Sequence, residues 1–203
     1  MPQTFIDNWF KTKGWKLHDH QIKMIQSGAS GSSSLLIAPT GGGKTLAGFL
    51  PSIIELNAYP TNSLHTIYIS PLKALTVDVA RNLLNPLSEM GLKITVETRT
   101  GDTPQSKRQR QRKSPPNILL TTPESLALLI SYPDSAAIFQ ELRCVIIDEL
   151  HALAPTKRGG LLSLALARLN KWAPKARRVG LSATIPYPEE MAEYLSCGQK
   201  IKT

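Results

Sequence analysis

Cysteine is scarce in this chain of 203 residues, which contains only Cys144 and Cys197. Two cysteines are too few to predict a disulfide framework or a cysteine-based metal site, and they favour a reducing compartment, so we expect the cytoplasm. No stretch approaches the roughly 20 consecutive apolar residues needed to cross a bilayer, and we expect no membrane contact. Residues 1–10 lack the apolar core of a secretory signal. The sequence therefore argues against a secreted or membrane-spanning protein.

Acidic residues are also in short supply, with 15 Asp and Glu against 24 Lys and Arg, and the formal net charge is +9. A cationic surplus favours a polyanionic partner such as nucleic acid. Solubility alone explains it equally well, so charge does not decide between the two. The hydrophobic fraction of 41% predicts a globular fold, and the length suits one domain over residues 1–203.

Short aliphatic runs alternate along the chain with segments of helical pattern. The runs are almost continuously apolar, as expected for parallel strands buried on both faces. We predict strands over residues 35–38, 66–70, 94–98, 118–121, 145–148 and 179–182. We predict helices over residues 45–57, 72–90, 104–113, 124–130, 161–171 and 188–195, and a flexible turn over residues 28–34. This alternation predicts an α/β fold: an open, mostly parallel twisted sheet with helices on both faces and ligands at the carboxyl ends of its strands.

A glycine-rich segment, Ala-Pro-Thr-Gly-Gly-Gly-Lys-Thr over residues 38–45, follows the first predicted strand and opens a helix. Glycines let backbone amides turn inward around a triphosphate, where a Cβ would obstruct them. Lys44 would contact the β- and γ-phosphates, and the Thr45 hydroxyl would bind Mg²⁺. The alternative, a glycine-rich turn before a helix, leaves the Lys-Thr pair unexplained. The residues predicted to bind ATP are Thr40, Gly41, Gly42, Gly43, Lys44 and Thr45.

A second motif, Asp-Glu-Leu-His over residues 148–151, follows a buried apolar run. Neighbouring side chains on a strand point to opposite sides, so the two carboxylates can have different tasks. We expect Asp148 to hold Mg²⁺ and Glu149 to be the base that orients or deprotonates the attacking water. With Lys44 these are the predicted catalytic residues. His151 is a candidate for coupling the nucleotide site to the rest of the protein; the alternative is a surface or capping histidine.

These motifs, followed by Ser182-Ala183-Thr184, resemble in kind and order those of superfamily 2 DExH/DEAD-type helicases. Three intervening segments resemble the nucleic-acid-contacting motifs of the large helicase-related (Lhr) branch, namely residues 70–75 (Ser-Pro-Leu-Lys-Ala-Leu), 99–102 (Arg-Thr-Gly-Asp) and 121–124 (Thr-Thr-Pro-Glu). Residues 148–169 resemble the same branch. Within it the chain is most similar to bacterial ligase-associated DNA damage response DExH helicases, and the resemblance covers about residues 9–195.

The resemblance implies a motor of two RecA-like lobes with ATP between them, of which this chain looks like the first. Family members supply an arginine finger from the second lobe in a Gln-x-x-Gly-Arg-x-x-Arg pattern, which this sequence lacks, so we expect the single lobe to hydrolyse ATP poorly. Gln21 resembles the glutamine that reads the adenine edge, since an amide can donate and accept; the alternative is a surface helix glutamine. The aromatic residues that could pack on the base are Phe5, Trp9, Phe10 and Trp15.

The resemblance also implies contacts with the nucleic-acid backbone just past strand ends, where hydroxyls and helix amino termini bind phosphates without reading bases. The predicted contact residues are Pro71, Lys73, Thr100, Gly101, Thr121 and Thr122. Ser182 and Thr184 are predicted to couple the nucleotide site to nucleic acid by bonding the acidic box. For each of these residues the alternative is turn chemistry, because Thr, Gly and Pro also terminate strands.

Two further segments of the sequence are basic. The first contains Lys107, Arg108, Arg110, Arg112 and Lys113. It has no interleaved aromatic residue to stack on bases, and we interpret it as a solvated helix face rather than a DNA contact. For the second, Lys157 and Arg158, the resemblance favours a loop that faces nucleic acid.

Other classes of protein also carry phosphate loops. A GTPase would have an Asn-Lys-x-Asp base reader, but the Asn170-Lys171 pair lacks the Asp. A kinase would need an acceptor pocket and lid, and would have little use for Glu149. A module that binds ATP or DNA without turnover is a stronger rival for a single lobe. By resemblance we expect DNA rather than RNA as the partner, a second RecA-like lobe, and a functional association with a DNA ligase and nuclease.

Overall fold

The structure is a computed structural model that describes residues 4–39, 41–183, 185, 187–196 and 201–203. In this part of the chain seven strands form one sheet in the order β3-β4-β2-β5-β6-β1-β7. Every pairing between them is parallel, which confirms the predicted class of fold. The strands are β1 (Ser33–Ile37), β2 (Thr66–Ile69), β3 (Val96–Arg99), β4 (Ile118–Thr121), β5 (Cys144–Ile147), β6 (Arg177–Ser182) and β7 (Ile201–Lys202).

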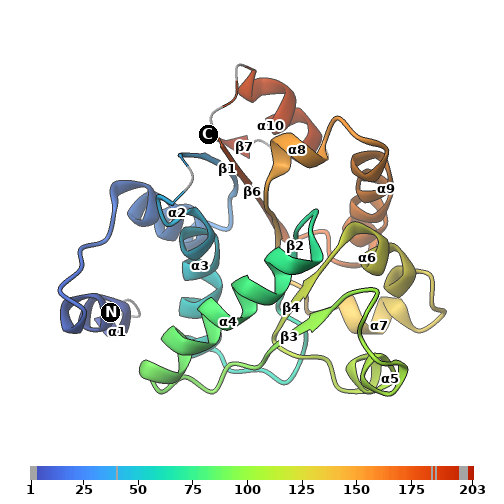
Figure 1. The fold of residues 1–203 in the computed structure, drawn as a ribbon, viewed down its shortest axis with the longest axis horizontal. Coiled ribbons are helices and arrows are strands. Elements are labelled where there is room, and N and C mark those ends of the chain that lie inside the picture. Colours follow the sequence, from blue (N-terminus) through green and yellow to red (C-terminus); the bar gives the residue numbers. More distant parts are fainter. Residues whose placement is uncertain (1–3, 40, 184, 186, 197–200) are drawn as a thin grey trace.

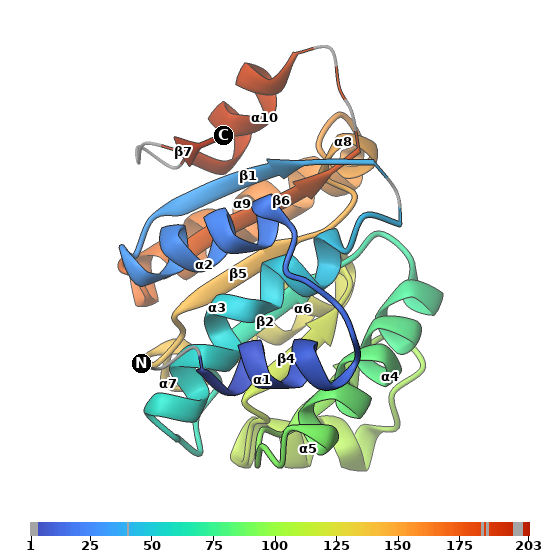
Figure 2. The ribbon, with the colours of Figure 1, turned by 90° about the vertical axis from the view of Figure 1, so that its left-hand side faces the viewer.

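Helices cover both faces of the sheet (Figures 1 and 2). On one face lie α2 (Asp19–Ala29), α3 (Lys44–Ala58) and α4 (Lys73–Glu89), with α1 (Thr4–Thr12) packed outside α2 and α3. On the other face lie α6 (Pro123–Ile130), α7 (Ser135–Phe139), α8 (Leu150–Leu153), α9 (Lys157–Trp172) and α10 (Pro188–Ser196). The remaining helix, α5 (Gln105–Lys113), covers the edge strand β3 through Gln111, whose side chain donates to Thr98 O. None of the described helices combines the length and apolar character needed to cross a membrane.

The central strands alternate between two cores. In β2, Ile67 and Ile69 pack in the core beneath α6 and α9, whereas Tyr68 packs beneath α3 and α4. In the register of the sheet, Ile69 lies between Thr121 of β4 and Ile147 of β5. These carboxyl ends therefore form a row, and the residues that follow each strand gather at one edge of the sheet.

The stretch predicted to be a flexible turn is mostly regular structure, so that prediction is wrong. Helix α2 continues through Gly28, and Ser33 and Ser34 already belong to β1. A Cβ built on Gly28 would lie 2.3 Å from the Cβ of Pro51, so glycine is needed for α2 to approach α3 this closely. The small residues here serve close packing rather than flexibility.

Candidate functional site

The glycine-rich loop joins β1 to the amino terminus of α3. Gly41 and Gly43 have φ angles of 83° and 73°, a left-handed region that glycine adopts without strain. Gly43 is the N-cap of α3, and within the described residues no side chain caps this helix. The first-turn amides of α3 are therefore available to an anion, which the helix dipole also favours. The predicted contact Thr40 lies outside the described residues.

Lys44 supplies a cation to the loop. Its side chain is buried, and Nζ donates to the carbonyl oxygens of Ala38 at 2.8 Å and Pro39 at 3.0 Å. An ammonium group has three protons, so these two bonds hold it within the loop with one donor to spare. The loop thus combines open backbone amides with one buried positive charge.

The carboxylate of Asp148 faces the start of α3. Its Oδ2 lies 3.4 Å from the Thr45 hydroxyl and accepts a hydrogen bond of 2.5 Å from the Tyr68 hydroxyl, while Oδ1 accepts from the Glu149 amide at 2.8 Å. Burial, followed by the charge of Asp148, raises the pKa of Tyr68 far above its ordinary value, so this hydroxyl stays a donor. Tyr68 is not among the residues predicted for the site. The available signal was a phenol in an otherwise aliphatic buried strand, since a buried phenol needs a partner.

The two acids lie past the strand rather than on it. Strand β5 ends at Ile147, and Glu149 has φ 50° and ψ 42°. We predicted that the alternation of side chains along a strand separates the two carboxylates, and this is wrong. The left-handed backbone conformation of Glu149 separates them instead. Glu149 is the one non-glycine residue with positive φ in the described part of the chain. Such strain costs about 1–3 kcal/mol and tends to occur at functional sites.

His151 lies between the acid pair and the end of β6. Its Nδ1 accepts from the Ala183 amide at 3.3 Å and lies 3.0 Å from the Ser182 hydroxyl. Because Nδ1 accepts from an amide, the ring proton belongs on Nε2, which lies 3.4 Å from Glu149 Oε2. Ser182 is thus linked to the acidic box through His151 rather than directly. Thr184, the other predicted coupling residue, lies outside the described residues.

Gln21 is 2% exposed, which contradicts the surface-glutamine alternative. Its Oε1 accepts from the His18 amide at 3.0 Å, and its Nε2 would lie 3.0 Å from a Cβ built on Gly43. Gln21 therefore packs against the phosphate loop. Its side chain also completes the capping box of α2, and its role in reading a base stays a prediction.

The aromatic residues near the amino terminus are less available to a base than predicted. Trp9 and Phe10 are buried in a core cluster with Leu50 of α3, and Trp9 Nε1 donates to Glu89 at 2.7 Å. The prediction that they pack on a base is wrong, because they attach α1 to its neighbours. Trp15 is exposed, and Phe5 is half-buried against two core clusters.

The three predicted backbone-binding segments lie side by side at the carboxyl edge of the sheet. The Ser70 amide donates to Thr121 O at 3.1 Å, and Lys73 forms an ion pair of 2.8 Å with Asp102, beside Gly101. Arg158 donates to the carbonyl oxygen of Pro71 at 2.6 Å. The motifs are thus brought together as the resemblance implied, although Lys73 is already paired.

The three predicted threonine contacts have structural partners instead. Thr121 is fully buried in β4, and its hydroxyl donates to Arg99 O at 2.7 Å. Its side chain cannot reach a phosphate from there, so that prediction is corrected. Thr122 is the N-cap of α6 and accepts from the Ser125 amide at 3.4 Å. The Thr100 hydroxyl accepts from the Asp102 amide within its own turn at 3.3 Å. Backbone amides remain the groups that these segments can offer.

The basic run on α5 keeps Arg110 and Lys113 exposed, in agreement with a solvated helix face, but its arginines also have partners. Arg108 donates to Thr100 O at 3.1 Å and to Gly101 O at 2.5 Å. Arg110 pairs with Glu97 at 2.6 Å, and Arg112 pairs with Asp134 at 2.6 Å. These arginines connect α5 to strand β3 and to the loops around it. Lys157 and Arg158 likewise open helix α9 rather than forming the expected loop.

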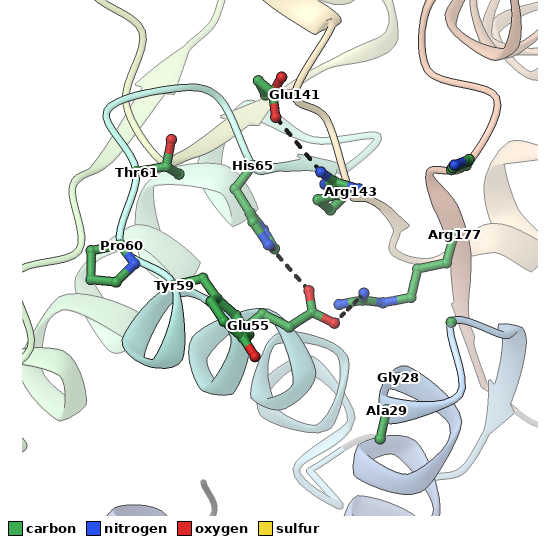
Figure 3. A pocket seen from close by; sticks show the side chains of 12 residues that line it. Gly28, Ala29, Glu55, Tyr59, Pro60, Thr61, His65, Glu141, Arg143 and Arg177 are labelled. Carbon is green, nitrogen blue, oxygen red and sulfur yellow. Dashed lines mark hydrogen bonds and ion pairs between the residues drawn. The ribbon is translucent and has the colours of Figure 1, made fainter.

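A cavity of about 520 Å³ lies at the opposite edge of the sheet (Figure 3). It is lined by groups at the amino ends of strands, including His65, Arg143 and Arg177. Glu55 pairs with His65 at 3.1 Å and with Arg177 at 2.6 Å. This cavity is remote from the phosphate loop, and Glu55 already pairs with His65 and Arg177 of its lining, so we do not assign the nucleotide to it.

The fold and the site define a class. A parallel sheet with a glycine-rich loop and Lys-Thr pair after β1, and an acid pair after β5, forms a phosphate-loop nucleotide-binding lobe. The profile of the DEAD/DEAH box helicases matches residues 18–192. The chain belongs to the DEAD/DEAH box helicase family.

Individual relatives agree with this membership. The chain is 44% identical over 204 residues to the Lhr helicase/probable uracil glycosylase of Mycolicibacterium smegmatis, covering 93% of this chain and 13% of the relative. It is 41% identical over 205 residues to the ATP-dependent helicase Lhr-Core of Methanocaldococcus jannaschii, covering 94% and 24%. The structure of Mycobacterium smegmatis helicase Lhr bound to ssDNA and AMP-PNP superimposes with a TM-score of 0.91 at 40% identity, over 99% of this chain and 28% of that one. The predicted likeness to the Lhr branch is confirmed, and the chain spans a quarter or less of the two relatives' lengths.

Proposed function

We propose that this chain is the first RecA-like lobe of an ATP-driven helicase. In this proposal it binds Mg-ATP at the phosphate loop and a nucleic-acid backbone at the neighbouring strand ends. The observation that carries the proposal is the approach of the Thr45 hydroxyl to Asp148 at 3.4 Å, which joins the loop to the acid pair. In the whole protein, hydrolysis here would drive translocation and strand separation.

The residues present fit Mg²⁺. Thr45 and Asp148 offer one hydroxyl and one carboxylate, both hard oxygen ligands. Within the described residues no group of three or more His, Cys, Asp and Glu is placed to hold a metal ion. Two oxygens suit a Mg²⁺ that takes its other ligands from phosphates and water. When bound there, Mg²⁺ would neutralise charge on the phosphates.

The remaining groups divide the chemistry between them. The open amides of α3 and the Lys44 ammonium would hold the β- and γ-phosphates. Glu149 would accept a proton from the attacking water, and His151 Nε2–H would orient the Glu149 carboxylate from 3.4 Å. Gln21, packed against Gly43, would contact the base. Ser182 would relay changes at His151 to β6.

We propose DNA as the preferred nucleic acid. A similar structure at 40% identity is described as bound to ssDNA, and the chain carries a net charge of +9. The resemblance to ligase-associated helicases supports a role in DNA repair with a DNA ligase and nuclease. It also supports a cytoplasmic location and a second RecA-like lobe that supplies the arginine finger.

Two substitutions test the nucleotide side. Lys44→Ala should weaken ATP binding by tenfold or more, because a charge-assisted contact contributes about 1.5–3 kcal/mol. Glu149→Gln should bind ATP as the wild type does. In a two-lobed protein containing this chain, it should lower nucleic-acid-stimulated hydrolysis by about 10²–10⁴-fold. The wild-type chain alone should hydrolyse ATP slowly, because the arginine finger is supplied in trans.

The matched control is Glu141→Gln, which removes an exposed carboxylate near the remote cavity. It should leave both nucleotide binding and hydrolysis unchanged. Equal loss of ATP binding in the Lys44 and Glu149 variants would contradict the role of Glu149 as base. Unimpaired ATP binding in Lys44→Ala would contradict the proposed site.

A further inference from the structure

Arg158 joins two of the helix amino termini at the nucleic-acid edge. Its Nε donates to Glu124 Oε1 at 2.5 Å and its NH2 to Glu124 Oε2 at 2.9 Å, while NH1 donates to Pro71 O at 2.6 Å. Glu124 lies in the first turn of α6, and Pro71 lies two residues before α4 begins. One planar guanidinium group therefore fixes both segments at once, which a point-charge ammonium could not do.

The local sequence holds Arg158 in place. The Thr156 hydroxyl caps α9 by accepting from the Gly159 amide at 3.2 Å. A Cβ on Gly159 would lie 2.3 Å from Ala154 O and 2.5 Å from Leu153 O, so only glycine allows α9 to start this close to α8. Gly159 thus sets where α9 begins, and this position of the helix places the Arg158 side chain between Glu124 and Pro71.

Stability alone does not explain this arrangement. The Arg158 and Glu124 side chains are 39% and 52% exposed, and exposed ion pairs typically contribute about 0.2–1 kcal/mol. The pKa of Glu124 is lowered, first by the hydrogen bond from Arg158, so this carboxylate is ionised. An unpaired anion here would lie where the proposed function brings phosphates, and it would repel them.

We propose that Arg158 is a positioning residue, which holds the amino termini of α4 and α6 at the spacing that successive phosphates of a bound strand require. This inference rests on the proposed function. The helix amides make the contacts. Within the described residues no side chain caps α4, whereas at α6 Pro123 has no N–H and Thr122 caps the Ser125 amide, so the Glu124 amide is the group that α6 contributes. Arg158 sets their separation through Pro71 and Glu124, and at the same time neutralises Glu124.

The test is the affinity of the chain for a labelled oligothymidylate of about 12 nucleotides, measured by fluorescence anisotropy at low salt. Arg158→Ala and Glu124→Ala should each lower affinity by about five- to tenfold. The double variant should show the same loss, because the two side chains act through one another. Arg158→Lys should recover only part of it. ATP affinity should not change in any of them.

Arg143→Ala is the charge-matched control, since it removes one exposed cation at the opposite edge of the sheet and should leave DNA affinity unchanged. Amide hydrogen exchange gives a second readout that needs no DNA. Arg158→Ala should accelerate exchange in the first turns of α4 and α6 while leaving the first turn of α3 unchanged.

Three results would contradict this inference while leaving the proposed function intact. If the double variant bound the oligothymidylate with wild-type affinity, the only role of Arg158 would be to neutralise Glu124. Full affinity in Glu124→Ala, with loss in Arg158→Ala, would make Arg158 a direct phosphate contact. Unchanged exchange at α4 and α6 would remove the positioning role. Failure of the wild-type chain to bind any single strand would instead contradict the proposed function, and the inference with it.

Discussion

Asp148 shows how single residues define the site. One of its oxygens accepts from Tyr68 and lies near Thr45, and the other accepts from the Glu149 amide. These bonds orient the carboxylate. The local motifs predicted Asp148, Glu149 and Thr45 because each lies within a few residues of its motif partners. Tyr68 was not predictable in this way, since its partner is 80 residues away along the chain.

Tyr68→Phe tests this orientation. The substitution keeps the ring, which stacks on Phe49 at 5.3 Å, and removes only the hydroxyl. Mg-ATP affinity should fall by about tenfold, since a hydrogen bond to a charged group contributes about 1.5–3 kcal/mol. Isothermal titration measures this, with Tyr59→Phe, an exposed tyrosine, as the matched control. Wild-type affinity in Tyr68→Phe would show that Asp148 needs no such donor.

At the scale of elements, the sequence predicted the long helices and central strands but not the short or amphipathic pieces. The aliphatic runs of β2, β4 and β5 were found because both of their faces are buried. Helices α7 and α8 have five and four residues, too short to show a period. Strand β7 has two residues and depends on β1 for its pairing. In α1 and α2 the apolar positions pack on other helices, a tertiary arrangement that local pattern does not specify.

Three elements meet at Glu55, which makes their contact pH-dependent. Burial alone would raise the pKa of Glu55, but the hydrogen bond from His65 and the charge of Arg177 together lower it below its ordinary value of 4.5. Because the folded-state pKa is depressed, this contribution to stability is complete above the unfolded-state pKa. It is lost as pH falls through the lower folded-state value.

Glu55→Gln should therefore destabilise the chain by about 1–3 kcal/mol at pH 7, because buried Arg177 loses its anion. That corresponds to a fall in Tm of several degrees, at about 2–4 °C per kcal/mol for this length. The difference from wild type should shrink as pH falls below 4.5. Thermal unfolding between pH 7 and pH 3 measures it, with Glu141→Gln as control. A difference that is constant across this range would contradict the assignment.

Across the whole molecule, the proposed nucleotide site and the proposed nucleic-acid site lie at one edge of the sheet. Strand β2 belongs to both, because Tyr68 donates to Asp148 while Pro71, just past the strand, accepts from Arg158. A shift of β2 would therefore move Tyr68 and Pro71 together and so change the geometry of both sites. Much of the positive charge on α5 serves internal pairing, so the net charge of +9 was a weaker guide to the partner than the motifs were.

The central proposal is that the phosphate loop would hold the phosphates of ATP and that Thr45 and Asp148 would hold its Mg²⁺. The most direct measurement is the affinity of the chain for ATP with Mg²⁺ and with EDTA, in the wild type and in Asp148→Asn. The wild type should bind at least tenfold more tightly with Mg²⁺, and Asp148→Asn should bind equally with and without it. Retention of the full Mg²⁺ dependence by Asp148→Asn would contradict the claim.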